Sequence, residues 1–243
     1  MIEELRQRLR GLERPPGLED GPAALPLGAA AVDRVLGGGL MRSALHEIAA
    51  AGEAHVAAAT GFVAGVAALS SQGAVWVAED MAALESGAPY GPGLDGFGVA
   101  PERLITVAVA QRRDLMWAME EALRCRAVAC VIGEMRHGAL DAVAVRRLSL
   151  AAAETGALAL ILRAAPGDDA STAATRWIVG AAASDGVEPR MLAQLVRNRR
   201  GPRGQWILEW SDSDGRFTCA AHAQPVALPP RHRPHRPVAR SVA

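Results

Sequence analysis

The stretch GEAHVAAATG, residues 52–61, lies between a short apolar run and a small-residue helical pattern, where a phosphate-binding loop would stand. Such a loop holds phosphates with backbone N–H groups at a helix N-terminus and adds one lysine followed by Ser or Thr. Here Gly52 opens the stretch and the helix is expected to begin near Thr60, but Thr60 and Gly61 come in the reverse order and no lysine accompanies them. The chain has no lysine at all, because its 26 basic residues are all arginine. Lysine-based chemistry is therefore excluded.

Composition favours one soluble domain. The 243 residues are 50% apolar and carry a formal net charge of zero, so a sizeable core can form and no overall field attracts nucleic acid or a membrane. The three cysteines, Cys125, Cys130 and Cys219, have no metal-ligand spacing and suit a reducing compartment. The N-terminus carries charges throughout, and no apolar run approaches a membrane span. We expect a cytoplasmic protein without metal or cofactor.

Short apolar runs alternate with longer helical patterns through the middle of the chain. Continuous apolar strands separated by crossover-length helices are typical of a mostly parallel sheet covered on both faces, so we expect an α/β fold. A helix within residues 29–39 is expected to end at glycine, where left-handed backbone costs little. The predicted strands occupy residues 44–49, 74–79, 104–109, 127–133 and 157–163.

The two ends of the chain differ from this middle part. Two extended runs joined by NRRGPRG, residues 198–204, predict an antiparallel hairpin appended to the parallel sheet. From Pro225 onward, prolines and arginines without any acid predict a flexible tail. Apolar residues at helical spacing within residues 2–13 predict a short amphipathic helix. The expected division is an N-terminal helix and linker (1–24), a core (25–220) and a tail (221–243).

The segment LPLGAAAVDRVLGGGLMRSALHEIAAAG, residues 25–52, resembles the entry to the RecA core, and the order of later elements is similar to roughly residue 215. With AATRW at 173–177 and VRNRRGPRG at 196–204, this lysine-free version resembles the ImuA family. The resemblance implies a mostly parallel twisted sheet flanked by helices, with a C-terminal antiparallel hairpin. It also implies an accessory protein encoded beside ImuB, an inactive homologue of Y-family polymerases, and an error-prone replicative-type polymerase.

The chain departs from the nucleotide-binding pattern at a second motif as well. In ACVIGEM, residues 129–135, Gly133 takes the position that the family pattern gives to a Mg²⁺-holding aspartate. Glu134, one residue later, points to the opposite side of an extended chain. The resemblance places the water-activating carboxylate at Glu79 or Asp80. The sequence does not fix the register of this strand, so both residues remain candidates. With both motifs degenerate, we expect no catalytic residues, and retained binding of ATP is left open.

Residues 165–182 match the DNA-contacting loop of RecA and the helix after it. The loop carries adjacent acids at 168–169 and no basic residue before Arg176, so it would repel a phosphate backbone. DNA binding is therefore not carried over to this loop. We expect Asp169 or Ser171 to cap the helix that contains Arg176. The family's polar sensor, at the end of the preceding strand, corresponds to Arg163.

Arginines gather in the hairpin and in the tail. Trp206 and Trp210 flank the hairpin arginines, and their even spacing places both on one face of a strand. Guanidinium groups bind phosphate or carboxylate through paired donors and stack on indole rings, so the patch suits DNA, a nucleotide edge or an acidic protein surface. The candidate binding residues are Arg197, Arg199, Arg200 and Arg203 in the hairpin and Arg231, Arg233 and Arg236 in the tail.

Three functions fit these observations. The degenerate motifs favour a non-catalytic adaptor in damage-induced (SOS) mutagenic translesion synthesis, which binds ImuB, the error-prone DNA polymerase III alpha-type subunit, or both. A regulator of RecA filaments and a DNA-dependent ATPase of RecA type are the alternatives. The predicted N-terminal helix corresponds to the element by which RecA protomers associate, and its apolar stripe leaves self-association and capture of a partner equally open.

Overall fold

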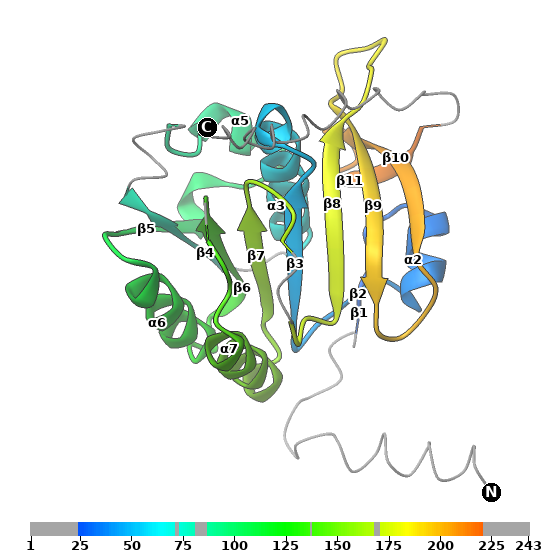
Figure 1. Cartoon of the computed structure of the whole chain (residues 1–243). Helices are drawn as coiled ribbons and strands as arrows, with labels where there is room; N and C mark the ends of the chain where they lie inside the picture. Colours follow the sequence, from blue (N-terminus) through cyan, green and yellow to red (C-terminus); the bar gives the residue numbers. More distant parts are fainter. Residues whose placement is uncertain (1–23, 71–72, 81–86, 137, 168–170, 221–243) are drawn as a thin grey trace, which may run out of the picture.

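The computed structural model describes residues 24–70, 73–80, 87–136, 138–167 and 171–220. These residues build a three-layer arrangement in which helices lie on both sides of a central sheet (Figure 1). The predicted N-terminal helix and the predicted tail lie outside the described residues.

Nine strands of the described residues form the central sheet, in the order β11-β10-β9-β8-β3-β7-β6-β4-β5. The neighbouring strands β5, β4, β6, β7, β3 and β8 all pair in parallel. The pairs β8–β9, β9–β10 and β10–β11 are antiparallel. This confirms the mostly parallel sheet with an antiparallel C-terminal hairpin, and β8 and β11 add two strands beyond the prediction. The strands are β3 (Ala44–Ala50), β4 (Gly73–Glu79), β5 (Leu104–Val109), β6 (Val128–Met135), β7 (Leu158–Arg163), β8 (Thr175–Ala181), β9 (Arg190–Asn198), β10 (Gly204–Ser211) and β11 (Arg216–Cys219).

Helices cover the two faces of the sheet unequally. One face carries α3, with α2 and α5 nearby, while α6 and α7 lie side by side on the other face over β4, β6, β7 and β3 (Figure 1). The helices are α2 (Ala30–Leu36), α3 (Val56–Leu69), α5 (Gly91–Asp95), α6 (Arg112–Leu123) and α7 (Ala142–Thr155), with 3-10 turns η1 (Glu53–His55) and η2 (Pro101–Arg103).

The hydrophobic core is split in two by the sheet, and this division explains the continuous apolar strands. Every residue of β3 and of β7 is buried, because helices press on both faces of these central strands. Phe62, Trp177 and Trp210 lie in the cluster under α3, whereas Leu115 and Leu148 lie in the cluster under α6 and α7.

The chain enters the sheet through a small two-stranded ladder, β1 (Ala24–Leu25) and β2 (Leu40–Met41), which brackets α2. As predicted, α2 ends at glycine: Gly37 has φ of 75° and its N–H caps the last turn. Asp33 of α2 accepts N–H groups from Leu27 at 2.8 Å and Gly28 at 3.0 Å, which fastens the approach to β3.

Candidate functional site

The stretch predicted as a degenerate phosphate loop does follow the carboxyl end of β3. Five residues, 51–55, connect β3 to α3, and the helix begins at Val56 rather than near Thr60, because the apolar run before Thr60 already continues the helix. The N-cap residue His55 gives no side-chain hydrogen bond to the first turn of α3. Instead, its Nδ1 accepts the N–H of Ala181 at 3.0 Å, which ties the loop to the end of β8.

The glycines of this stretch have different structural roles. Gly52 is extended, with φ of 166°, and a side chain there would meet no atom within 4 Å. Gly61 lies inside α3, and a Cβ at that position would press into the ring of Phe97. Packing therefore explains Gly61, and nothing in the structure explains Gly52.

The second motif is placed differently from the prediction. Gly133 faces α6, where a Cβ would collide with Met119, so this glycine permits close packing of helix on strand. Glu134 is the residue that faces α3: it lines a pocket with Thr60 and Gly61. The two side chains do point to opposite faces of the sheet, as predicted. The position that faces α3 and the phosphate-loop region, however, is 134 and not 133, so the predicted position was wrong by one residue.

Glu134 sits in a partly apolar environment. Its Oε2 accepts the indole N–H of Trp76 at 2.9 Å. Burial raises the pKa of the Glu134 carboxyl, while the Trp76 hydrogen bond and the charge of Arg136 act in the opposite direction. A carboxylate is thus present near the position where the family pattern holds Mg²⁺, but it is already engaged by an indole.

A pocket of about 510 Å³ lies between α3, the segment 87–97 and the end of β6. Arg136, just beyond β6, lines it together with Glu53 of η1, and the two side chains pair at 3.1 Å between Nη2 and Oε1. Sequence reasoning missed Arg136 and the aromatic wall residue Phe97. The signal for Arg136 was its place directly after a parallel strand, where the carboxyl ends of such strands meet.

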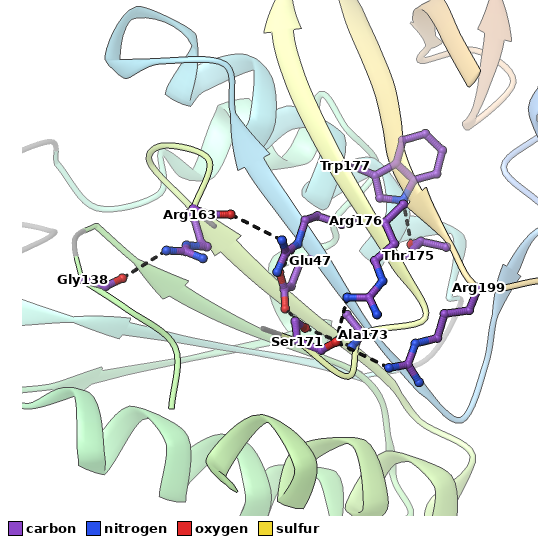
Figure 2. Close-up of polar contacts among 11 residues, drawn as sticks. Glu47, Gly138, Arg163, Ser171, Ala173, Thr175, Arg176, Trp177 and Arg199 are labelled. Carbon is purple, nitrogen blue, oxygen red and sulfur yellow. Dashed lines mark hydrogen bonds and ion pairs between the residues drawn. The ribbon is translucent and has the colours of Figure 1, made fainter. Parts of the chain in front are cut away.

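Two other residues carried over from the family pattern form structural contacts. Glu79, at the end of β4, pairs with Arg112 of α6 at 3.1 Å. Arg163, at the end of β7, is buried and donates from Nη2 to the carbonyl of Gly138 at 3.1 Å (Figure 2). Both contacts connect neighbouring elements at the carboxyl edge of the sheet.

The segment after β7 leads into a strand, which overturns the predicted capped helix. Arg176 and Trp177 belong to β8, and Asp169 lies outside the described residues. Ser171 does not cap a helix: its hydroxyl donates to the buried carboxylate of Glu47 and accepts the N–H of Ala173 at 3.0 Å. This segment forms a strand rather than a helix because alternate side chains of β8 fill the core under α3.

Glu47 is the centre of a polar cluster on the sheet face opposite α3. Arg176 Nε lies 2.8 Å from Glu47 Oε2, and the Glu47 side chain is 2% exposed. Figure 2 shows Arg176 and Ser171 around Glu47. Arg199, which directly follows β9, reaches the backbone carbonyl of Ser171. These contacts hold the chain between β7 and β8 against the sheet.

The predicted arginine patch is divided by the fold. Arg197 Nη1 donates to the carbonyl of Ser171 at 2.8 Å, and Arg199 makes a longer contact to the same oxygen at 3.5 Å. Arg200 and Arg203 are exposed in the turn between β9 and β10. Trp206 and Trp210 share the core face of β10, as predicted.

The arginine turn and the degenerate loop lie at opposite ends of the sheet. Asn198, the last residue of β9, pairs with Thr175, which in turn pairs with His46 near the start of β3. The turn is therefore at the amino end of β3, and the loop at 51–55 follows its carboxyl end. Within one chain the two features cannot act on the same small ligand. The tail residues Arg231, Arg233 and Arg236 lie outside the described residues.

The described ranges contain neither a candidate membrane-spanning helix nor a candidate metal site. No helix in these ranges is long and apolar enough to cross a membrane. No group of three or more His, Cys, Asp or Glu side chains there could hold a metal ion.

The strand order, the crossover helices and the loop after β3 define a RecA-like α/β protein. The crystal structure of the RadB recombinase has the same fold, with a TM-score of 0.59 and 14% identity over 81% of this chain and 99% of that one. No family model matches the chain. Protein ImuA of Caulobacter vibrioides, in strains NA1000 and ATCC 19089, is 31% identical over 198 residues, which cover 71% of this chain and 77% of the relative. The chain belongs to the ImuA family.

Proposed function

We propose that the protein is a non-catalytic RecA-like adaptor in SOS mutagenic translesion synthesis, which binds ImuB, the error-prone polymerase complex, or both. Membership of the ImuA family supports the mutagenic role. The fold supplies a scaffold whose surface loops can serve as contacts for partners.

The proposal that the protein is non-catalytic rests on the residues at the N-terminus of α3. Its first turn is built from Val56 and the alanines 57–59, so no cationic side chain of the loop can neutralise a terminal phosphate. The nearby Arg136 is already paired with Glu53. Glu134 adds a second carboxylate to the same pocket, which disfavours a polyphosphate.

Hydrolysis is tested directly with purified protein. We expect no phosphate release from ATP above background, with or without single-stranded DNA, under conditions in which RecA is active as a positive control. DNA-dependent release would instead favour the ATPase alternative.

The adaptor role is tested by binding. We expect the full chain to bind purified ImuB, and deletion of residues 225–243 to weaken that binding, because the tail offers arginines to an acidic surface. Unchanged affinity would remove the tail from the proposal. Capture of RecA without any binding to ImuB would favour the filament regulator.

A further inference from the structure

The pocket beside α3 has the construction of a docking site for one charged side chain with apolar neighbours. Along α3 it is walled by residues without bulk, Ala57, Gly61 and Ala64, and the ring of Phe97, which also lines the pocket, packs directly on the helix at Gly61. Tyr90 stands at its edge with 73% of its surface exposed. Exposed aromatic rings beside a pocket are typical anchors of protein interfaces.

Arg136 gives this pocket two unsatisfied donor atoms. Its side chain is only 8% exposed, yet Nε and Nη1 have no hydrogen-bond partner among the residues that the structure describes. Only Nη2 is engaged, by Glu53, whose own side chain is 73% exposed. A guanidinium binds a carboxylate best through two parallel N–H donors, so the donor fork of Arg136 is half used.

The N-terminus of α3 adds a second attraction for an anion. Val56 and Ala57 line the pocket, and no side chain caps the first turn of this 14-residue helix. The N–H of Val56 already donates to the carbonyl of Glu53, so the attraction comes from the helix dipole, which favours one negative charge at this end. Glu53 and Glu134 limit that charge, because they would repel the several charges of a nucleotide polyphosphate far more than a single carboxylate.

We propose that this pocket receives an acidic side chain of the partner protein, which displaces Glu53 and takes two donors of Arg136, while a neighbouring apolar side chain packs on the exposed ring of Tyr90 at the edge of the pocket. The inference rests on the proposed adaptor function and names its docking site. Charge complementarity favours a partner with a surface carboxylate, since two donor atoms of the Arg136 guanidinium have no hydrogen-bond partner among the described residues.

The test measures the affinity of the full chain for purified ImuB by titration calorimetry. Arg136→Gln removes the charge, and Ala57→Trp fills the pocket from an exposed helix position. We expect each variant to raise Kd at least tenfold. Arg126→Gln and Ala54→Trp are the matched controls, because both positions are exposed and outside the pocket, and these should stay within twofold. Thermal unfolding of each variant shows that it is folded.

The outcomes separate the two proposals. If the wild-type chain binds ImuB and both pocket variants bind equally well, the docking site is wrong and the adaptor role stands. If the wild-type chain does not bind ImuB, the adaptor role fails and the docking site fails with it. Competition by excess ATP or by an oligonucleotide, lost in Arg136→Gln, would show that the pocket takes phosphate and would overturn the carboxylate proposal.

Discussion

The indole N–H of Trp76 donates to the carboxylate of Glu134 across the adjacent strands β4 and β6, with 2.9 Å between Nε1 and Oε2. Trp76 is 1% exposed, so its N–H has no access to water as an alternative partner. The carboxylate in turn is held where burial raises its pKa. The two residues therefore satisfy each other at the edge of the candidate pocket.

Substitutions at Glu134 separate its hydrogen bond from its charge. We expect Glu134→Leu to lower the free energy of unfolding by about 1–2 kcal/mol, because the buried indole N–H is left without an acceptor. Glu134→Gln keeps an accepting oxygen and removes a buried charge, so we expect no loss at pH 7. Chemical denaturation of the two variants measures the difference.

A pH series controls this interpretation. A raised pKa in the folded state means that the folded protein binds the proton more tightly, so stability from this group rises as pH falls through that pKa. The wild-type protein should therefore approach or exceed Glu134→Gln on acidification. Equal stability of the Leu and Gln variants at pH 7 would contradict the role given to the hydrogen bond.

Burial of His46 is expected to make the stability of the protein depend on pH in the opposite direction. It is fully buried and donates from Nε2 to the carbonyl of Met41 at 2.8 Å, so Nδ1 accepts the hydroxyl of Thr175 at 2.7 Å. Desolvation lowers the pKa of His46 to about 4. Below pH 6.5 the unfolded chain takes up a proton that the folded chain refuses, so stability falls between pH 6.5 and pH 4.

The expected loss at pH 5, relative to pH 7, is about 2 kcal/mol from this residue. Urea denaturation at the two values measures it, and His46→Gln provides the control because it cannot titrate. The variant should lose less stability than wild type over the same interval. An identical pH dependence in both proteins would rule out His46 as the source.

The sequence allowed the central strands to be predicted because each is an apolar run between patterns long enough for a crossover helix. The strand β8 was missed because the leading Ala-Ala of AATRW suits a helix, although Thr175, Trp177 and Val179 alternate toward the core under α3. Here tertiary burial outweighed local propensity. The start of α3 was misplaced for a related reason, since alanines before Thr60 fit either a loop or a helix.

The candidate site could be located from the sequence but not oriented. Which of Gly133 and Glu134 faces α3 depends on a one-residue register that only strand pairing fixes. Arg136 has no motif of its own and becomes significant only because the fold brings it beside Glu53. The hairpin arginines were found, but the inward contacts of Arg197 depend on a chain segment 26 residues away.

Breaking the ion pair between Glu47 and Arg176 from one side is expected to destabilise the fold strongly. Glu47 is 2% exposed, so removal of Arg176 leaves a buried carboxylate whose remaining contact includes Ser171. We expect Arg176→Ala to cost about 3–5 kcal/mol, as for other broken buried pairs. Denaturant unfolding of the single variants and of the double variant measures the coupling.

Non-additivity is the decisive feature of this prediction. If the residues act as a pair, Glu47→Ala combined with Arg176→Ala should cost clearly less than the sum of the single changes. Arg126→Ala, at an exposed position outside the cluster, is the control and should change stability by less than about 0.5 kcal/mol. Strictly additive losses would show that the two side chains act independently.

The two glycines at either end of the degenerate loop should respond oppositely to alanine. Gly52 is extended with open space around it, so Gly52→Ala should gain up to about 1 kcal/mol by restricting the unfolded chain. Gly61→Ala should lose about 1–2 kcal/mol, since overpacking against Phe97 exceeds the gain in helix propensity. Thermal unfolding compares the two variants.

Phe97 explains why Gly61 cannot relax easily. Its ring packs against Trp210 with centroids 5.8 Å apart, and Trp210 is itself fully buried, so the ring has little room to retreat from an added methyl group. Gly61→Ala combined with Phe97→Leu should therefore recover part of the loss. If Gly61→Ala alone were as stable as wild type, the close packing of Phe97 on α3 would not be the reason for glycine at this position.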